Sequence, residues 1–249
     1  MASNIHKTVC DTKLFVTLYN KYNNYYMYDY YAIYWFIGSC VFVRSMYYVI
    51  DIKLKRSVPT YSKLPVFRQM YIQKNFIKSI FLALLTIYAT ITVIWPIATQ
   101  NKWNSYIIHR LAALYVSNDF TGLVCVDKLP QTTKIHHIVT TILVFVALGI
   151  DFQTSDIGQA MLVYTMASSA AYIVNLHLAM RWLWPKNALK LLRYIAAGVY
   201  VSTCAASWSW HLWWAFTRAH FNIGHAFYFL LLGWIVRDDI ILMQWLTRD

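Results

Sequence analysis

The sequence predicts an all-α protein that crosses a membrane about seven times. Of its 249 residues, 59% are hydrophobic and 13% are charged, whereas soluble domains average about 25% charged residues. Several apolar stretches reach the roughly 20 residues that a helix needs to cross a bilayer. Aromatic residues make up 18% of the chain, which excludes a disordered protein, and the four scattered cysteines exclude a disulfide scaffold.

Seven apolar segments fit membrane spans, and the first four occupy the N-terminal part of the chain. The first lies near 30–50 and follows a tyrosine-rich stretch, which we interpret as an aromatic belt at the membrane surface. The second and third lie near 76–97 and 105–126, and the fourth, near 134–150, is short. Prolines fall only in the connections or at span ends, as expected because an interior proline removes a helix hydrogen bond.

The remaining three segments lie near 157–180, 190–216 and 223–247. Four tryptophans close to the end of the sixth segment predict a second aromatic belt. The seventh contains Asp238 and Asp239, which we interpret as the cytosolic end of that span.

The distribution of charge predicts the orientation of the chain. Lys and Arg number 22 against 10 acidic residues, and the cations gather in connections such as 51–75 and 181–193. Cytosolic connections carry the excess of Lys and Arg, so this bias predicts a lumenal N-terminus and a cytosolic C-terminus. Cations that flank apolar stretches do not form the basic face of a nucleic-acid-binding domain, so we expect no nucleic-acid partner. We expect one multipass domain over 29–249, preceded by an interfacial, lumenal segment at 1–28.

Polar groups within the predicted spans indicate a functional site, because ionisable residues are costly in lipid. Three spans place such groups near their predicted cytosolic ends, at similar depth in one leaflet. The candidates are Asn118 and Asp119, His136 and His137 with Thr140 one turn further on, and Asn175 and His177. Histidine suits proton transfer, since its reference pKa of about 6.5 lies near physiological pH. We expect the two histidines to be catalytic, with Asp119 stabilising the protonated ring, and the other candidates to bind substrate.

Other interpretations of these residues remain open. Neighbouring helical residues point about 100° apart, so His136 and His137 cannot face one spot, and one would do chemistry while the other fixes a hydrogen bond. Both could instead be interfacial histidines bound by water or headgroups, and Asp119 could pair with a cation such as Arg110 or Arg44. We interpret the histidines on the lumenal side as interfacial: His109, His211, His220 and His225. No cysteine and histidine spacing suggests zinc and no nucleotide fingerprint occurs, so we expect neither a metal nor a bound cofactor.

The segment around the paired histidines resembles a known family. The stretch 134–145, KIHHIVTTILVF, resembles the helix with paired histidines in the TLC family, which includes ceramide synthases, translocation-associated membrane proteins and several lipid-homeostasis proteins. The stretch 115–120, with Asp119, resembles the family helix that carries an upstream aspartate, and 168–175 resembles a later segment with small residues before an asparagine. The similarity covers residues 70–247 approximately.

The resemblance implies a TLC-type helical bundle around a lipid-holding cavity in the endoplasmic reticulum. It also implies transfer of a fatty acyl group from acyl-CoA to a lipid amine or hydroxyl at the cytosolic leaflet, with His136 and His137 as catalytic residues and Asp119 as their helper. The second half of the ceramide-synthase motif is absent and the chain contains no glutamate, so it is more similar to the smaller family members that adjust membrane lipid composition.

The expected function is therefore an acyltransferase reaction with acyl-CoA as co-substrate and membrane lipid as acceptor. The alternative is a protein that binds or senses lipid without catalysis. Small residues at 167–171 predict either tight helix packing or room for an acyl chain beside the fifth span.

Overall fold

The computed structural model describes residues 29–217 and 221–248, and every regular element in this part of the chain is a helix. The prediction of an interfacial segment at 1–28 lies outside the described residues, as does His220. The helices are α2 (Tyr30–Ser57), α3 (Pro59–Ser62), α4 (Val66–Ala89), α5 (Trp95–Gln100), α6 (Ser105–Cys125), α7 (Gln131–Ala147), α8 (Asp156–Ser169), α9 (Tyr172–Met180), α10 (Lys186–Thr217) and α11 (Ile223–Thr247), with the π-helical turn η1 (Thr90–Ile94) between α4 and α5.

All seven apolar segments of the sequence are helical, although two boundaries differ from the prediction. The second segment begins at Val66 rather than near residue 76, because α4 contains a polar first half. The fifth is divided into α8 and α9 by a turn at Ala170 and Ala171. Helix α11 continues past Asp238 and Asp239 to Thr247, so both lie inside the helix, and their interpretation as the cytosolic end of the span stays a prediction.

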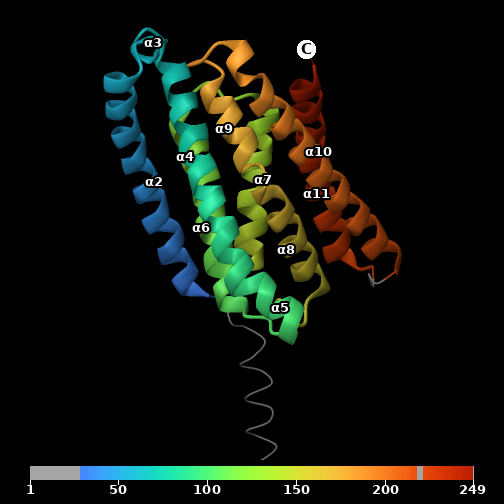
Figure 1. Ribbon diagram of the computed structural model, residues 1–249. Helices are drawn as coiled ribbons and strands as arrows, with labels where there is room; N and C mark the ends of the chain where they lie inside the picture. Colours follow the sequence, from blue (N-terminus) through green and yellow to red (C-terminus); the bar gives the residue numbers. More distant parts are fainter. Residues whose placement is uncertain (1–28, 218–220, 249) are drawn as a thin grey trace, which may run out of the picture.

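The long helices run alongside one another as a bundle (Figure 1). The short helix α3 and the C-terminal end of α11 lie at one end, and α5 lies at the other. Helix α2 packs against α6, α4 against α9, and α7 against both α6 and α11. Helix α10 contacts α8, α9 and α11. This arrangement places α7, which carries the paired histidines, between α6 and α11.

Three helices within the described residues are long and apolar enough to cross a membrane: α2, the continuous helix Val66–Gln100, and the α8–α9 pair Asp156–Met180. Large apolar side chains point outward along the bundle, including Tyr34, Val41, Leu84, Leu191 and Leu230, each more than 60% exposed. Soluble monomers rarely expose so much contiguous apolar surface, whereas a bilayer would cover it. The fold is thus compatible with a helical membrane protein, and the full set of seven spans stays a prediction.

Candidate functional site

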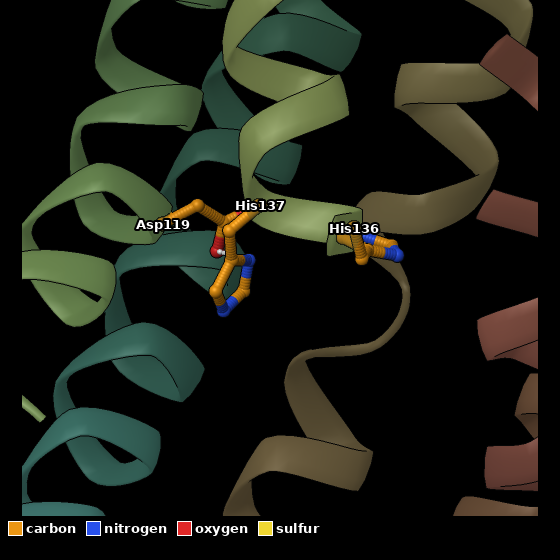
Figure 2. Close-up of side chains that lie close together, drawn as sticks. All are labelled: Asp119, His136 and His137. Carbon is orange, nitrogen blue, oxygen red and sulfur yellow. Dashed lines mark ion pairs between the residues drawn. The ribbon is translucent and has the colours of Figure 1, made fainter. Parts of the chain in front are cut away.

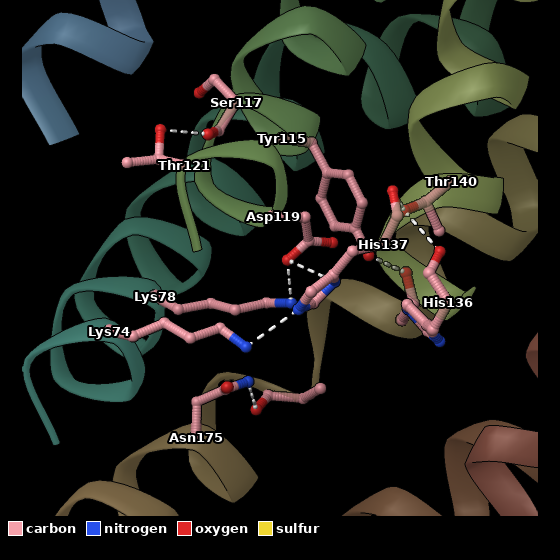
Figure 3. A network of polar contacts seen from close by, with 12 residues as sticks. Lys74, Lys78, Tyr115, Ser117, Asp119, Thr121, His136, His137, Thr140 and Asn175 are labelled. Atoms are coloured by element: carbon pink, nitrogen blue, oxygen red, sulfur yellow. Dashed lines mark hydrogen bonds and ion pairs between the residues drawn. The ribbon is translucent and has the colours of Figure 1, made fainter. Parts of the chain in front are cut away.

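The interior of the bundle is polar near the end that holds α3 and the C-terminus. His137 on α7 is buried there, with Nδ1 3.4 Å from Oδ1 of Asp119 on α6 and Nε2 2.8 Å from Nζ of Lys74 on α4. Lys78, one turn further along α4, forms an ion pair with the same carboxylate. Figure 3 shows both lysine side chains reaching toward Asp119 and His137. Three helices are therefore joined by one charged cluster.

The contacts of this cluster define the hydrogen positions on His137. A lysine ammonium has only donors, so Nε2 of His137 accepts from Lys74 and the ring proton sits on Nδ1, facing Asp119. A buried charge is tolerated when it is paired, and Asp119, which is fully buried, has both Lys78 and His137 beside it. Both nitrogens of His137 are thus occupied by protein groups. The alternative that Asp119 pairs with a cation is correct, but its partner is Lys78 rather than Arg110 or Arg44.

His136 faces a different partner, as the helical geometry predicted. Its ring lies 5.7 Å from that of His137, at 90°, and its Nδ1 is 3.3 Å from Oδ2 of Asp238 on α11. Figure 2 shows the ring of His136 directed away from Asp119. No described residue forms a hydrogen bond with its Nε2. The two histidines therefore each face their own aspartate, and His136 keeps one ring nitrogen open.

The neighbouring Asp239 is also turned inward. It is 4% exposed, and its Oδ1 accepts a hydrogen bond of 2.7 Å from the hydroxyl of Tyr200 on α10. Helix α11 thus supplies two adjacent carboxylates to the interior, one to α7 and one to α10.

A cavity of about 360 Å³, within the usual range for small-molecule sites, is lined by residues of α4 and α6–α11. Its wall includes Lys74, Lys78, His136, His137, Asp238 and Asp239. A second cavity of about 70 Å³, lined almost wholly by apolar side chains, lies further along the bundle. Tyr115 and Tyr164 line both cavities, so the polar chamber adjoins an apolar one.

Four further predicted residues occupy different positions around this cavity. Asn175 lines it and donates a 2.8 Å hydrogen bond from Nδ2 to the Ala171 carbonyl. Thr140 lines the smaller cavity, and its hydroxyl donates to the carbonyl of His136. Asn118 is buried and His177 packs against Trp245, and neither lines the larger cavity. A substrate-binding role for these last two therefore has no support from the geometry.

Lys74, Lys78, Asp238 and Tyr200 belong to the site but were missing from the sequence prediction. Lys74 and Lys78 are four residues apart, a spacing that places both on one face of a helix. Two like charges on one helical face require a partner of opposite charge. The spacing of these lysines could therefore have predicted that α4 contributes to the site. Asp238 lies within an apolar run that continues to Trp245, which could have indicated an inward-facing carboxylate.

Three of the histidines that we interpreted as interfacial belong to the described residues, and all three are buried inside the bundle. His225 is 2% exposed, with Nε2 3.0 Å from Oδ2 of Asp156. His211 lies 2.9 Å from the hydroxyl of Tyr228, and His109 lies 2.9 Å from the carbonyl of Ile150. Protein groups contact each of these rings, and the depth of the three residues in a membrane stays a prediction.

Asp119, His136 and His137 bring candidate ligand atoms within 4.8 Å of one another, close enough to consider a metal ion. Lys78 already neutralises Asp119, and Lys74 occupies Nε2 of His137. A cation at this position would have to displace one ammonium group and sit beside another. The donor set therefore suits a network of proton donors and acceptors better than a metal.

No family model matches the sequence, and no curated protein or solved structure matches it either. The similarity to the TLC family consequently depends on the residues and spacing quoted above.

Proposed function

We propose that this chain is an intramembrane lipid acyltransferase of TLC type with seven membrane spans. It would transfer a fatty acyl group from acyl-CoA to a lipid amine or hydroxyl in the cytosolic leaflet of the endoplasmic reticulum. Its N-terminus would be lumenal and its C-terminus cytosolic, as the distribution of cations predicts.

The observation that carries this proposal is the pairing of His136 with Asp238. A carboxylate at one ring nitrogen holds the imidazole in position and stabilises its protonated form, which leaves the other nitrogen free to act as a base. His136 fits this description, since Nδ1 faces Asp238 and Nε2 is open toward the cavity. His137, whose two nitrogens are both engaged, is less suited to accept a proton from substrate.

The reaction follows from these positions. Nε2 of His136 takes the proton from the acceptor amine or hydroxyl as that group attacks the thioester carbonyl. A bond forms between the acceptor atom and the acyl carbon, and the carbon–sulfur bond breaks. The imidazolium then returns its proton to the CoA thiolate, so the products are the acylated lipid and CoA.

The lysines supply positive charge to the same cavity. Lys74 and Lys78 both line it, whereas Asp119, which pairs with Lys78, is not among the lining residues. Fixed positive charge stabilises an oxyanion when it is preorganised in a poorly hydrated site. The lysines beside His137 would thus stabilise the oxyanion of the tetrahedral intermediate, and His136 would transfer the proton.

The smaller cavity favours a second candidate, a protein that binds or senses lipid without catalysis. Its apolar lining next to a polar chamber is suited to any lipid with a polar head and an acyl chain, and binding alone requires no base.

The two functions are separated by an assay of purified protein with acyl-CoA and a panel of acceptor lipids. CoA release that depends on acceptor, and that falls at least about 100-fold in His136→Ala, supports the enzyme. Undiminished CoA release in His136→Ala contradicts the assigned base. Co-purified lipid without CoA release for any acceptor would favour the binding protein.

A further inference from the structure

Arg181, at the outer end of the cavity, is held between aromatic rings. It follows the last residue of α9, and it belongs to the cavity wall. Its Cζ lies 4.8 Å from the ring centre of Trp245, 5.0 Å from that of Trp182 and 5.2 Å from that of Tyr71. Rings stabilise a guanidinium through its flat faces, and they leave its N–H edge available for another partner.

The N–H edge of Arg181 has a donor without an acceptor. Its Nε is buried and forms no hydrogen bond. None of the ion pairs formed by the described residues includes Arg181, so no carboxylate there neutralises it. A buried charged donor that remains unpaired is costly, which indicates that its partner is a bound molecule.

A second cation increases the need for an anion. The guanidinium of Arg68 lies 4.3 Å from the centre of the same Trp182 ring, so two positive groups share one indole. Arg68 is also absent from the ion pairs of the described residues. Like charges placed together repel each other, and an anion between them would reverse that unfavourable interaction.

Two ordinary explanations account for only part of this arrangement. The C-terminus of a helix stabilises cations, so the end of α9 favours one arginine. An arginine at a membrane surface also contacts headgroups in general. Neither explains a buried Nε that belongs to a cavity wall and lacks an acceptor.

We infer that Arg181, supported by Arg68, binds the phosphate of an amphiphilic substrate whose acyl chain enters the cavity. Guanidinium groups match phosphate oxygens with two parallel hydrogen bonds. Arg181 lies at the end of the bundle, His136 lies further in, and the apolar cavity lies beyond Tyr115 and Tyr164. A ligand with a phosphate, a carbonyl and a hydrocarbon chain in that order would fit. This inference rests on the proposed function for the nature of the substrate, and the phosphate could belong to CoA or to a phospholipid.

Binding of unreactive ligands tests the inference independently of catalysis. The probes are a palmityl-CoA thioether, the matching palmityl-pantetheine thioether without phosphate, and phosphatidic acid, each added to the full-length protein in a phosphate-free detergent. Arg181→Gln should weaken binding of a phosphate-bearing probe at least about 10-fold and leave the pantetheine thioether within about twofold. Arg181→Lys should retain part of the affinity. Arg56→Gln, at an exposed arginine in the last turn of α2, is the matched control and should change nothing.

The probes also identify the source of the phosphate. Weaker binding of the CoA thioether alone assigns the site to CoA, and weaker binding of phosphatidic acid alone assigns it to a lipid headgroup. Equal weakening of all three probes, or no effect on either phosphate-bearing probe, would overturn the inference. If Arg181→Gln does not fold, weaker binding of a phosphate-bearing probe to Arg181→Lys, with unchanged binding of the pantetheine thioether, gives the same decision, because lysine cannot form two parallel hydrogen bonds to phosphate. The binding assay requires no turnover. If the protein binds the phosphate-bearing probes but transfers no acyl group, that result refutes only the proposed enzymatic function.

Discussion

Replacing Asp119 by asparagine removes the negative charge that faces Lys78 and His137 inside the bundle. The side chain of Asp119 is fully buried and that of Lys78 is 10% exposed, so water cannot replace the lost partner. Breaking a buried ion pair from one side costs about 3–5 kcal/mol, because the other charge remains uncompensated. With roughly 2–4 °C per kcal/mol for a chain of this length, the thermal midpoint should fall by roughly 10 °C.

Thermal unfolding of the purified protein in detergent measures this change. The double variant Asp119→Asn with Lys78→Met removes the stranded ammonium and should recover at least half of the loss. Lys55→Met is the matched control, because it breaks a Lys–Asp pair whose lysine side chain is 49% exposed, and such pairs contribute at most about 1 kcal/mol. An unchanged midpoint in Asp119→Asn, or a double variant as unstable as the single one, would refute the reasoning.

The same variant separates structural from catalytic roles of Asp119. If the carboxylate acts on the reaction through His137, acyl transfer should fall at least about 10-fold at temperatures where the variant is still folded, which corresponds to about 1.4 kcal/mol in the barrier. Full activity in a destabilised protein would make Asp119 a structural residue only.

Three further outcomes are expected. Asp238→Asn should lower acyl transfer at least about 10-fold, which is less than the roughly 10⁴-fold loss known for a triad aspartate because the side chain of Asp238 is 14% exposed and its field is weaker. An unchanged rate of CoA release would contradict the role of His136 as base. Ala171→Trp should fill the cavity and reduce the lipid that co-purifies with the protein, as measured by mass spectrometry. Leu191→Trp, on the exposed face of α10, should leave the lipid content unchanged. Equal lipid content in both variants would mean that the small residues at 167–171 serve only tight helix packing. Burial alone would raise the pKa of Asp151, but the Ser105 hydroxyl, the Gln153 backbone N–H and the Thr154 hydroxyl donate to its carboxylate and lower it overall. The ionised Asp151 carboxylate therefore stabilises the fold above its unfolded pKa of about 3.9, and this stabilisation is lost as pH falls through the lower folded pKa. Hydrogen exchange at 151–155 should accelerate below about pH 4 in the wild type. The acceleration should be smaller in Asp151→Asn, which has no carboxylate to protonate.

The helices could be predicted from the sequence because long apolar runs leave few alternatives. The start of α4 could not, since hydropathy treats polar residues as lying outside a span. Gln73 and Lys74 are polar and nevertheless buried, because they face the interior of the bundle rather than its outer surface. Asp238 likewise faces the interior from within α11, although hydropathy favours it as the end of a span.

The candidate site was predictable in part. Adjacent histidines at the start of α7 and an aspartate on α6 were identified as candidates, and the structure places Asp119 beside His137. The partner of His136 could not be found, because it depends on α11 packing against α7, a contact between segments far apart in the sequence. Asn118 and His177 do not line the larger cavity, because depth in the membrane does not specify which side of a helix faces it.

The ion pair between α4 and α6 also constrains how the chain enters the bilayer. Lys74 and Lys78 lie in the first half of the helix Val66–Gln100, and a charged side chain without a partner is costly inside a bilayer. The apolar second half of the helix Val66–Gln100 carries no charge and could insert alone, whereas the polar first half gains a neutralising carboxylate only when α6 packs against it. Packing of α6 against α4 would therefore bury Lys78 and Asp119 together as a neutral pair.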